Sequence, residues 1–406
     1  MSVDLANVIR PGDGIVCGMA CAEPQTLTEA LVAQRAAFSG ATPFLGVNYS
    51  GIVKPEHADH LRLTSYCGAG HNRALADAGV LDIHPHPYSR LGALIRTRAI
   101  PADVVLIQVS PPNAKGEYSL GLAAEYLVPA LEVCRAIVAE VNDRIPWTYT
   151  ERLLRESDFA LAVRSSRAPV ALPYGAPGEL ERTIARHAAA FVPDGATLEF
   201  GLGSLPGAIL GFLTSHKTLR VHSGAVGDGI VDLAKRGVID QVVGGQVFGT
   251  QRFFDFARQN PLVQLRSSEF THDPRVLFGI ERFVAVNSAV EVDLTGQVNA
   301  EVAGGSYVGA VGGALDFIRA ANQSPGGVSL IVLPSAVGTK ASRIVCKLSG
   351  PVATPRSEAG VIVTEQGAAD LRGCTLRERA KKMLGIAHPA FRAALEREAR
   401  EGGLIS

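Results

Sequence analysis

Residues 194–206 read DGATLEFGLGSLP: an aspartate-glycine turn, a short apolar strand, a glycine loop and a proline that opens a helix. Residues 13–24 read DGIVCGMACAEP and show the same order of turn, strand, glycine and proline. A second pair follows, because residues 103–119 and residues 282–299 each form a strand that opens into a turn with a glycine. The members of both pairs are about 180 residues apart. Two repeats with one spacing predict a duplicated domain.

Apolar runs of strand length alternate with helical stretches along the chain. Buried parallel strands have continuous apolar sequences and are connected by helices, so this alternation predicts α/β layers with open parallel sheets. A loop rich in proline and glycine at residues 172–180 predicts a domain boundary. We therefore expect an N-terminal domain at residues 1–178 and a C-terminal domain at residues 179–406. The predicted strands are Val104–Val109, Phe159–Val163, Leu198–Phe200, Phe283–Val286 and Leu330–Leu333, and the predicted helices are Thr26–Ala37, Leu120–Glu140 and an exposed Thr375–Glu401.

The composition argues against several classes of ligand. The chain has 406 residues, of which 47% are hydrophobic, enough to build two cores. Its formal net charge is zero and 19% of its residues are charged, so no basic field indicates nucleic acid or an anionic membrane. The longest apolar runs fall far below the roughly 20 residues of a membrane span, and the first residues lack the order of a secretory signal. We expect a cytoplasmic protein that acts on a small molecule.

The six cysteines are scattered along the chain without a Cys-x-x-Cys pair or a histidine cluster nearby. This spacing does not match a metal site, so we predict buried structural thiols and no metal. His84 and His86 alternate with prolines, which predicts an extended loop.

Five glycines lie within residues 304–313, after a strand that ends in Glu291 and Asp293. Glycine reaches positive φ and has no Cβ, so such a segment can bring backbone N–H groups close to a ligand. The two carboxylates project to one face of their strand, and the sequence leaves open whether they cap the turn at Gly296 or take part in catalysis. The segment as a whole predicts a ligand site.

Seven short motifs follow one another over nearly the whole chain. They are EVN with Pro146 at 140–146, LEFGLG with Pro206 at 198–206, VEVDLTGQVN at 290–299, GG-x-x-DF at 312–317, SRIV at 342–345, VTEQG at 363–367 and AHP at 387–389. With these motifs the chain resembles the acetyl-CoA hydrolase/transferase family, which includes the 4-hydroxybutyrate and succinyl-CoA:acetate CoA-transferases. Each motif alone is weak, whereas seven in the family's order are specific.

The resemblance implies two similar open-sheet α/β domains of the CoA-transferase (NagB/RpiA-like) type, with an acyl-CoA ester bound between them. It also implies a homodimer or homotetramer, and no cofactor beyond the coenzyme A of the substrate. In that family a glutamate attacks the thioester while backbone N–H groups form an oxyanion hole. By similarity, Leu202 and Gly313 are the oxyanion donors. The expected CoA site also contains Gly201, Gly203, Gly309 and Gly312. Ser342 and Arg343, with Lys347, are candidates for the CoA phosphates because arginine suits phosphate, and surface ion pairing is the alternative. Glu365 is expected at the carboxyl edge of a sheet, where its role is either ligand binding or structural.

The sequence departs from the family's pattern at the nucleophile. The family has His-Ser/Thr-Glu and then Asp, whereas residues 222–228 read HSGAVGD, which puts Gly224 at the position of the catalytic glutamate. Glycine has no side chain that can be acylated. Two further departures accompany it: His272 stands where the family commonly has asparagine, and Glu199 stands where it usually has glutamine. Histidine, unlike asparagine, can act as a general base near neutral pH.

Four hypotheses follow. Water activated by His272 or by a remaining carboxylate hydrolyses the thioester, or it hydrolyses a carbon-carbon bond in a cyclic or β-keto acyl-CoA. In the third, Glu199 enters the space beside Gly224 and restores CoA transfer. The fourth is a CoA-ester-binding protein without activity, against which the retained glycine clusters argue. Hydrolysis is favoured because water needs no covalent glutamate. The space at Gly224 is also predicted to admit a bulky acyl group.

Overall fold

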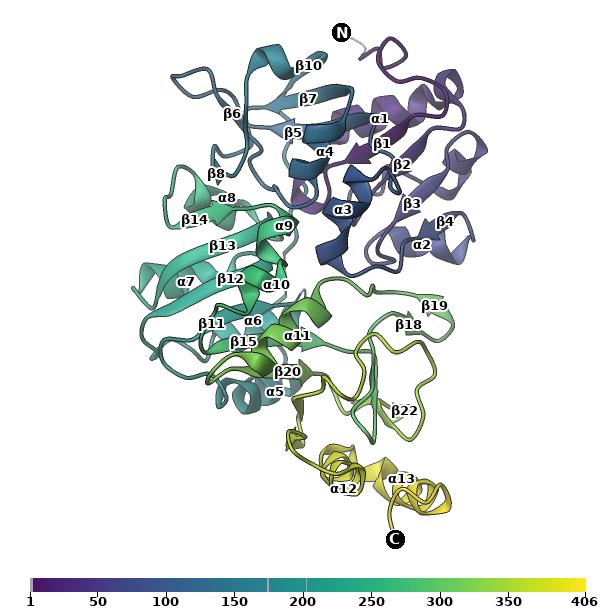
Figure 1. Ribbon diagram of the computed structural model, residues 1–406, viewed down its shortest axis with the longest axis vertical. Coiled ribbons are helices and arrows are strands. Elements are labelled where there is room, and N and C mark those ends of the chain that lie inside the picture. The colour runs from purple at the N-terminus through teal and green to yellow at the C-terminus, as the bar shows by residue number, and fades with distance from the viewer. Residues whose placement is uncertain (1–2, 174, 202) are drawn as a thin grey trace.

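The computed structural model describes residues 3–173, 175–201 and 203–406. It contains two open sheets of mostly parallel strands, one above the other along the long axis of the molecule (Figure 1). The first sheet has the strand order β10-β7-β5-β1-β2-β3-β4, and all its pairs are parallel. Its strands are β1 Gly14–Cys17, β2 Thr42–Phe44, β3 Leu63–Ser65, β4 Leu81–Ile83, β5 Val104–Val109, β7 Ala136–Asn142 and β10 Leu161–Ser165.

The second sheet has the strand order β25-β24-β20-β15-β11-β12-β13-β14-β8. Its pairs are parallel except for the edge pair of β24 and β25. Its strands are β8 Tyr149–Thr150, β11 Thr197–Phe200, β12 Leu219–Val226, β13 Ile239–Val247, β14 Val263–Leu265, β15 Phe283–Ser288, β20 Val328–Val332, β24 Val361–Thr364 and β25 Gly367–Asp370.

The two sheets repeat one topology. Reading each sheet from the same side, β10-β7-β5-β1-β2-β3-β4 corresponds to β24-β20-β15-β11-β12-β13-β14. The strands β1 and β11, and likewise β5 and β15, are the ones that begin the two sequence repeats, and each pair holds equivalent places in its sheet. The predicted duplication of an α/β domain is therefore confirmed by the order of the strands.

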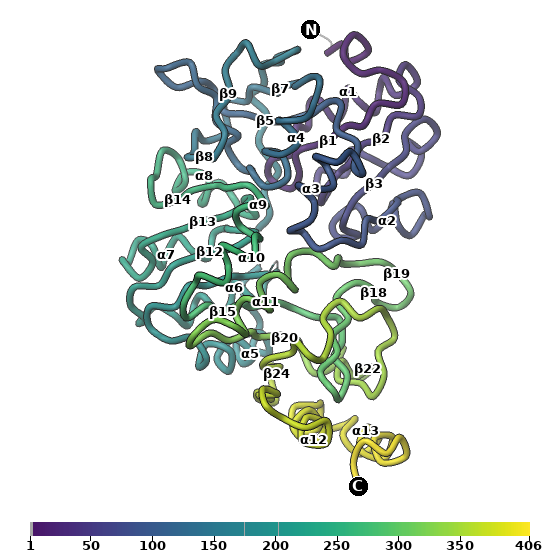
Figure 2. The backbone as a smooth tube through the Cα atoms, in the orientation of Figure 1, coloured from purple at the N-terminus to yellow at the C-terminus, as the bar shows by residue number. Residues whose placement is uncertain are grey.

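Helices and short hairpins connect the strands. Figure 2 shows that the N-terminal half of the chain, in purple and blue, lies over the C-terminal half, in green. The helices are α1 Gln25–Ala33, α2 Asn72–Asp77, α3 Leu91–Arg96, α4 Leu127–Val133, α5 Glu179–Ala189, α6 Ser204–Leu210, α7 Gly229–Lys235, α8 Gln251–Ala257, α9 Ser268–Thr271, α10 Pro274–Leu277, α11 Ala314–Gln323, α12 Leu376–Ile386 and α13 Pro389–Glu401. The short strands include β16 Glu291–Asp293, β18 Val302–Ala303, β19 Ser306–Tyr307, β22 Ala341–Ser342 and β23 Ile344–Val345.

The predicted helix Leu120–Glu140 is wrong over most of its length. The chain forms only the two-turn helix α4 there, and the run AIVAEVN from Ala136 is strand β7. A short apolar run fits a buried helix or a buried strand equally well. Pairing with β5 and β10 on either side decides for the strand, and every one of its residues is buried.

The predicted C-terminal helix is divided in two. Helix α12 ends at Ile386 and α13 begins at Pro389, whose ring lacks the N–H that a continuous helix needs. His388 caps α13, since its side chain accepts a hydrogen bond from the N–H of Ala390. Met383 of α12 and Leu395 of α13 belong to one hydrophobic cluster, so this segment packs against the C-terminal half and is not a free tail.

The halves interlock near the predicted boundary. Strand β8 precedes that boundary in the sequence but joins the second sheet by pairing with β14. The largest hydrophobic cluster contains strand residues of both sheets, such as Val105 and Val286. The division at residue 178 stays a prediction. Residues of both halves, such as Tyr66 and Gly313, meet in a crevice at the carboxyl ends of β11 and β15.

The structure shows how far the cysteines are buried and whether side chains group around a metal or a helix could span a membrane. Cys17, Cys21 and Cys67 are buried as predicted, whereas the other three cysteines are only partly buried, and all six are free thiols. Within the described ranges, no three or more histidine, cysteine, aspartate and glutamate side chains are grouped to hold a metal ion. Among the helices of those ranges, none is long and apolar enough to cross a bilayer.

Candidate active site

The loop before α11 is fixed against the N-terminal half of the chain. The carbonyl oxygen of Gly309 accepts a hydrogen bond from the N–H of Gly68 at 2.8 Å, and that of Gly312 accepts one from the N–H of Tyr88 at 2.9 Å. In Figure 2 this loop runs along the boundary between the halves, from β19 to α11. The last three of the five clustered glycines therefore lie in the crevice, while Gly304 and Gly305 only form the turn between β18 and β19.

A cavity of about 280 Å³ lies at this crevice, at the carboxyl ends of β11 and β15. Open α/β sheets usually bind ligands outside these strand ends. The N-terminal half contributes Val47, Tyr66, Cys67, Ala69 and Tyr88 to the wall. Seven residues that the sequence singled out line the same wall: Glu199, Gly201, Gly224, His272, Gly309, Gly312 and Gly313.

The ring of His272 fills the space between Gly224 and Gly313. A Cβ atom at Gly224 would lie 3.0 Å from Cε1 and Nε2 of His272, and a Cβ atom at Gly313 would lie 2.4 Å from Nε2. Both distances are shorter than ordinary van der Waals contact, so neither position accepts a side chain while the ring stays in place. His272 therefore takes up part of the space beside Gly224, while Gly224 still lines the cavity, so the predicted room for a bulky acyl group stays a prediction.

Hydrogen bonds orient the imidazole of His272. Thr271 Oγ1 donates to the carbonyl oxygen of Ser267 at 3.1 Å and lies 2.8 Å from Nδ1 of His272. Because the threonine proton is used, Thr271 Oγ1 accepts from Nδ1–H. The neutral ring then carries its lone pair on Nε2, the atom between the two glycines. This tautomer presents a hydrogen-bond acceptor at the cavity.

The surroundings of His272 are apolar. Its ring centroid lies 4.7 Å from that of Tyr88 and 4.6 Å from that of Phe317. Burial lowers the pKa of His272 from 6.5 to about 3, with a smaller contribution from His222. The imidazole is therefore neutral at neutral pH.

Glu199 also lines the cavity, as a buried carboxyl at the end of β11. Its Oε2 accepts a hydrogen bond from Nδ2 of Asn287 at 2.8 Å. Burial raises the pKa of Glu199 from 4.5 to about 8, although the hydrogen bond from Asn287 favours the ionised form. A carboxyl in this state is largely protonated at neutral pH and is a weak nucleophile.

Of the predicted oxyanion donors, only Gly313 can be placed. Gly313 precedes α11, and its N–H has no hydrogen-bond partner within residues 3–173, 175–201 and 203–406. Leu202 lies outside the described residues. The N–H of Gly201 donates to the carbonyl oxygen of Val286 at 2.7 Å, so Gly201 cannot serve as a donor in its place. Gly313 lines the cavity, and its role as an oxyanion donor stays a prediction.

Gly203 lines a separate cavity of about 60 Å³ and has a φ of 125°, which favours glycine. This cavity shares Phe200, Gly201 and Ala225 with the larger one. The two cavities thus adjoin at Gly201, which lines both of them.

Ser342, Arg343 and Glu365 do not line either cavity. Ser342 Oγ donates to the carbonyl oxygen of Ile344 at 2.6 Å. Glu365 accepts from the N–H of Ser335 at 2.9 Å and from its hydroxyl, which is a structural role. Arg343 is partly buried without an ion pair in the part of the chain that the structure describes, and burial lowers its pKa.

The two carboxylates of β16 hold turns. Asp293 accepts hydrogen bonds from the N–H and hydroxyl of Thr295 and from the N–H and side chain of Gln297. Glu291 accepts from the side chains of Asn299 and Ser349. Neither side chain lines the cavity. Asp293 therefore caps the turn at Gly296, whereas Glu291 ties Asn299 to Ser349 and has a structural role outside that turn.

Sequence reasoning missed Glu125 and Tyr88. Glu125 is fully buried with a φ of 21°, accepts a hydrogen bond from the hydroxyl of Tyr88, and leaves Oε1 without a partner among the described residues. Buried carboxyls in strained backbone concentrate at functional sites. The sequence contained one signal for Glu125, because it is the only charged residue in the apolar run of residues 120–131. That signal was overlooked because the run was interpreted as a helix.

We expect Glu125→Gln to flatten the pH dependence of stability. Burial raises the pKa of Glu125 from 4.5 to about 8. The stability gained from the neutral carboxyl is therefore complete below about pH 4.5 and is lost as the pH rises towards 8, by up to about 1.4 kcal/mol per pH unit. Glutamine keeps an acceptor for Tyr88 and does not titrate. Urea unfolding at pH 5 and pH 8 measures the free energy of unfolding of the wild type and of the variant. An equal decrease between the two pH values in both proteins would contradict a neutral buried carboxyl.

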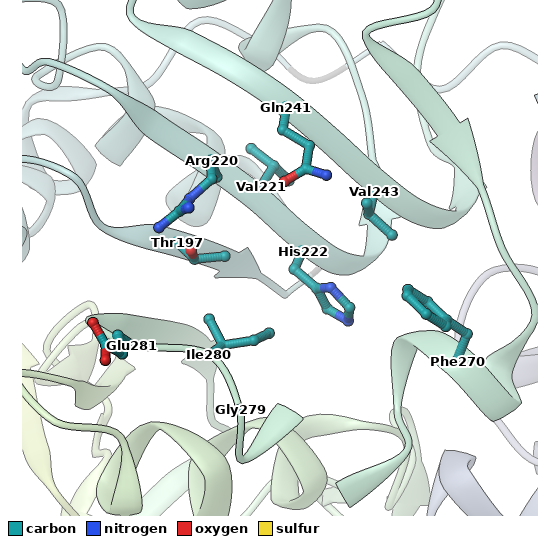
Figure 3. Close-up of a pocket in the computed structure, with 10 residues that line it drawn as sticks. All are labelled: Thr197, Arg220, Val221, His222, Gln241, Val243, Phe270, Gly279, Ile280 and Glu281. Atoms are coloured by element: carbon teal, nitrogen blue, oxygen red, sulfur yellow. The ribbon is translucent and has the colours of Figure 1, made fainter. Parts of the chain in front are cut away.

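An open cavity of about 390 Å³ lies on the second sheet, nearer the amino ends of β11 and β12 (Figure 3). Arg220, Gln241 and the ring of His222 are among its lining residues (Figure 3). It contains none of the predicted catalytic residues. His222 Nε2 lies 2.9 Å from the carbonyl oxygen of Thr271, which accepts its proton, so His222 is satisfied by the segment that carries His272.

Comparisons with known proteins cover most of the chain. The model of the acetyl-CoA hydrolase/transferase N-terminal domain matches residues 2–153, and that of the C-terminal domain matches residues 249–399. The 4-hydroxybutyrate coenzyme A transferase of Clostridium kluyveri is 35% identical over an alignment of 398 residues, which covers 95% of this chain and 93% of that protein.

Solved structures agree with the sequence comparison. The crystal structure of RipA from Yersinia pestis has a TM-score of 0.94 at 28% identity, over 99% of this chain and 96% of that chain. The 4-hydroxybutyrate CoA-transferase from Porphyromonas gingivalis has a TM-score of 0.83 at 31% identity, over 98% of this chain and 96% of that chain. The predicted fold class is thus confirmed by structures as well as by strand order.

Proposed function

Because this chain belongs to the acetyl-CoA hydrolase/transferase family and is an enzyme of that kind, we propose that it hydrolyses acyl-CoA esters with water as the nucleophile. One observation carries the proposal. The ring of His272 stands between Gly224 and Gly313, at the point where a side chain of residue 224 would enter the cavity. An acceptor nitrogen replaces a covalent nucleophile at this point.

The proposed reaction begins with a water molecule hydrogen-bonded to Nε2 of His272. Its oxygen attacks the carbonyl carbon of the thioester, and the carbonyl oxygen becomes an oxyanion that accepts from the N–H of Gly313. The lowered pKa of His272 makes the imidazole a weak base. Proton transfer to Nε2 becomes favourable as the water oxygen bonds to carbon and its own acidity rises.

Collapse of the tetrahedral intermediate breaks the carbon-sulfur bond. CoA leaves as a thiolate, and because an ordinary thiol has a pKa of about 8.5, its departure requires little acid assistance. The thiolate then takes a proton from solvent, and His272 releases its proton to solvent. The products are a carboxylic acid and free CoA. No carboxylate of the protein is consumed or acylated in this sequence.

Mass spectrometry after borohydride treatment tests the proposal. The enzyme is incubated with a panel of acyl-CoA esters, and free CoA is followed with and without acetate or succinate. We expect CoA release without an acceptor and no reducible adduct. A glutamyl-CoA thioester trapped on the protein would instead establish transfer. A cleaved acyl chain that stays attached to CoA would establish hydrolysis of a carbon-carbon bond.

CoA transfer is the second candidate, because Glu199 is a carboxyl in the wall of the same cavity. We expect Glu199→Gln to retain hydrolysis within about 10-fold, since water attack needs no protein carboxylate. The variant keeps the size of the side chain and a partner for Asn287. Initial rates of CoA release with and without acetate distinguish the candidates. Loss of all turnover in the variant, together with acetate-dependent turnover in the wild type, would favour transfer through Glu199.

The rest of the CoA molecule is proposed to extend away from the cavity. Arg343 lies outside the cavity wall and has no ion pair in the described ranges, and a guanidinium suits a phosphate group. Both carboxylate oxygens of Glu365 are already used by Ser335, so we do not assign Glu365 to CoA.

A further inference from the structure

We infer that the cavity selects an uncharged, apolar acyl group and rejects one that ends in a carboxylate. The inference rests on the proposed function only in placing the acyl group of a CoA ester in this cavity. It concerns the class of acyl group and does not depend on whether hydrolysis or transfer follows.

Four aromatic rings form a continuous wall of the cavity. The centroids of Tyr66 and Tyr88 are 5.1 Å apart, those of Tyr88 and His272 are 4.7 Å apart, and those of His272 and Phe317 are 4.6 Å apart. All four side chains line the cavity, two from each half of the chain. Such a wall contributes large apolar surface at fixed positions.

The polar ends of the two tyrosines are engaged with residues outside the wall. The hydroxyl of Tyr88 donates to Glu125, and that of Tyr66 lies 3.5 Å from Sδ of Met19. Neither Glu125 nor Met19 lines the cavity. The acyl group therefore meets the rings of the tyrosines, and their hydroxyls are not available to bind a carboxylate.

The wall of the cavity, as far as the structure describes it, offers no positive charge to an anion. Among the described residues that line it there is no lysine or arginine, and Glu199 is the one acidic side chain. A second carboxyl, Glu125, lies behind Tyr88. A terminal carboxylate on the acyl group would lose its water without gaining a cation, because both buried carboxyls are largely neutral at neutral pH and supply no positive charge. An unpaired buried charge of this kind is strongly disfavoured.

The size of the cavity agrees with an apolar ring or a short chain. Its volume of about 280 Å³ is nearly twice that of the engineered apolar cavity of roughly 150 Å³ that binds benzene. A thioester group with a cyclic or a four-carbon acyl group can therefore be enclosed.

Thioether analogues test the inference, because they cannot be hydrolysed or transferred. S-butyl-CoA and S-(3-carboxypropyl)-CoA differ only in the terminal carboxylate, and S-benzyl-CoA adds a ring. Calorimetry with the full chain should give a dissociation constant for the carboxypropyl analogue that is at least about 10-fold larger than those of the other two analogues. Equal or tighter binding of the carboxypropyl analogue would overturn the inference, and so would failure of all three to bind. Binding of the analogues without turnover of any ester would overturn the proposed function alone.

A charge introduced into the wall provides the matched control. Ala69 lines the cavity and is only partly buried, so a long side chain there can extend past the rim. Ala69→Lys should strengthen binding of the carboxypropyl analogue relative to S-butyl-CoA, whereas Ala69→Met, of similar length, should not. The same ratio in both variants would mean that charge does not determine selection.

Discussion

Replacement of His272 by alanine is expected to lower the rate of CoA release by at least about 10²-fold, the usual scale for loss of a general base. The reason is geometric, since Nε2 is the acceptor held between Gly224 and Gly313 by the hydrogen bond from Nδ1 to Thr271. Turnover of an acyl-CoA ester under saturating conditions, with circular dichroism to verify folding, measures the effect. His222→Gln is the matched control, because His222 is a second buried histidine that does not line the cavity. Undiminished turnover in the alanine variant would remove His272 from the mechanism.

The pH dependence of the same step follows from the lowered pKa. An ordinary histidine base would lose activity as the pH falls through 6.5, whereas His272, with a pKa of about 3, stays neutral. Activity carried by His272 should therefore show no loss centred at pH 6.5. Folding responds differently: between pH 6.5 and 3 the unfolded chain binds a proton that the folded protein does not, so stability falls as the pH falls, by up to about 1.4 kcal/mol per unit.

Gly224→Glu alone is expected to give no CoA-transferase activity. Combined with His272→Asn, it is expected to create a transferase. In the single variant, the new Cβ meets the His272 ring at 3.0 Å, and overpacking of this kind costs about 1–3 kcal/mol. In the double variant, asparagine is smaller than histidine and releases the space, so the new carboxylate reaches the cavity. We expect acetate-dependent CoA release and a borohydride-reducible adduct at residue 224, neither of which the single variants should show.

Gly224→Gln with His272→Asn controls for the change in volume. Glutamine has the size of glutamate but cannot form the acyl-enzyme. An adduct in both double variants would place the acylated group elsewhere, with Glu199 the first position to examine. Absence of an adduct and of acetate dependence in the glutamate variant would show that position 224 cannot host the nucleophile in this chain.

The architecture could be predicted because it is repeated. Two copies of a turn, a strand and a glycine at one spacing predicted the duplication, and β1 and β11 hold equivalent places in their sheets. Where a local pattern was ambiguous, as in residues 120–140, the prediction was wrong. The single charge at Glu125 interrupts an apolar run that fits either element, and long-range pairing of β7 decided the outcome.

The residues of the site could be predicted only in part. The glycines before α11 were found because a cluster of them is unusual for a core, and Glu199 was found because it stands where the resembled family usually has glutamine. The contact of His272 with Gly224 and Gly313 joins three distant segments, and no local pattern reports it. The hydrogen bond between Tyr88 and Glu125 was missed for the same reason. Arg343 and Glu365 were grouped with the cavity by resemblance, whereas they lie outside its wall.

The volume shared by residues 224 and 272 also bears on how such an enzyme changes over generations. A larger residue at 224 collides with the ring, and a smaller residue at 272 leaves a hole. Each single substitution away from the present pair is therefore expected to cost stability, whereas the two together compensate each other in volume.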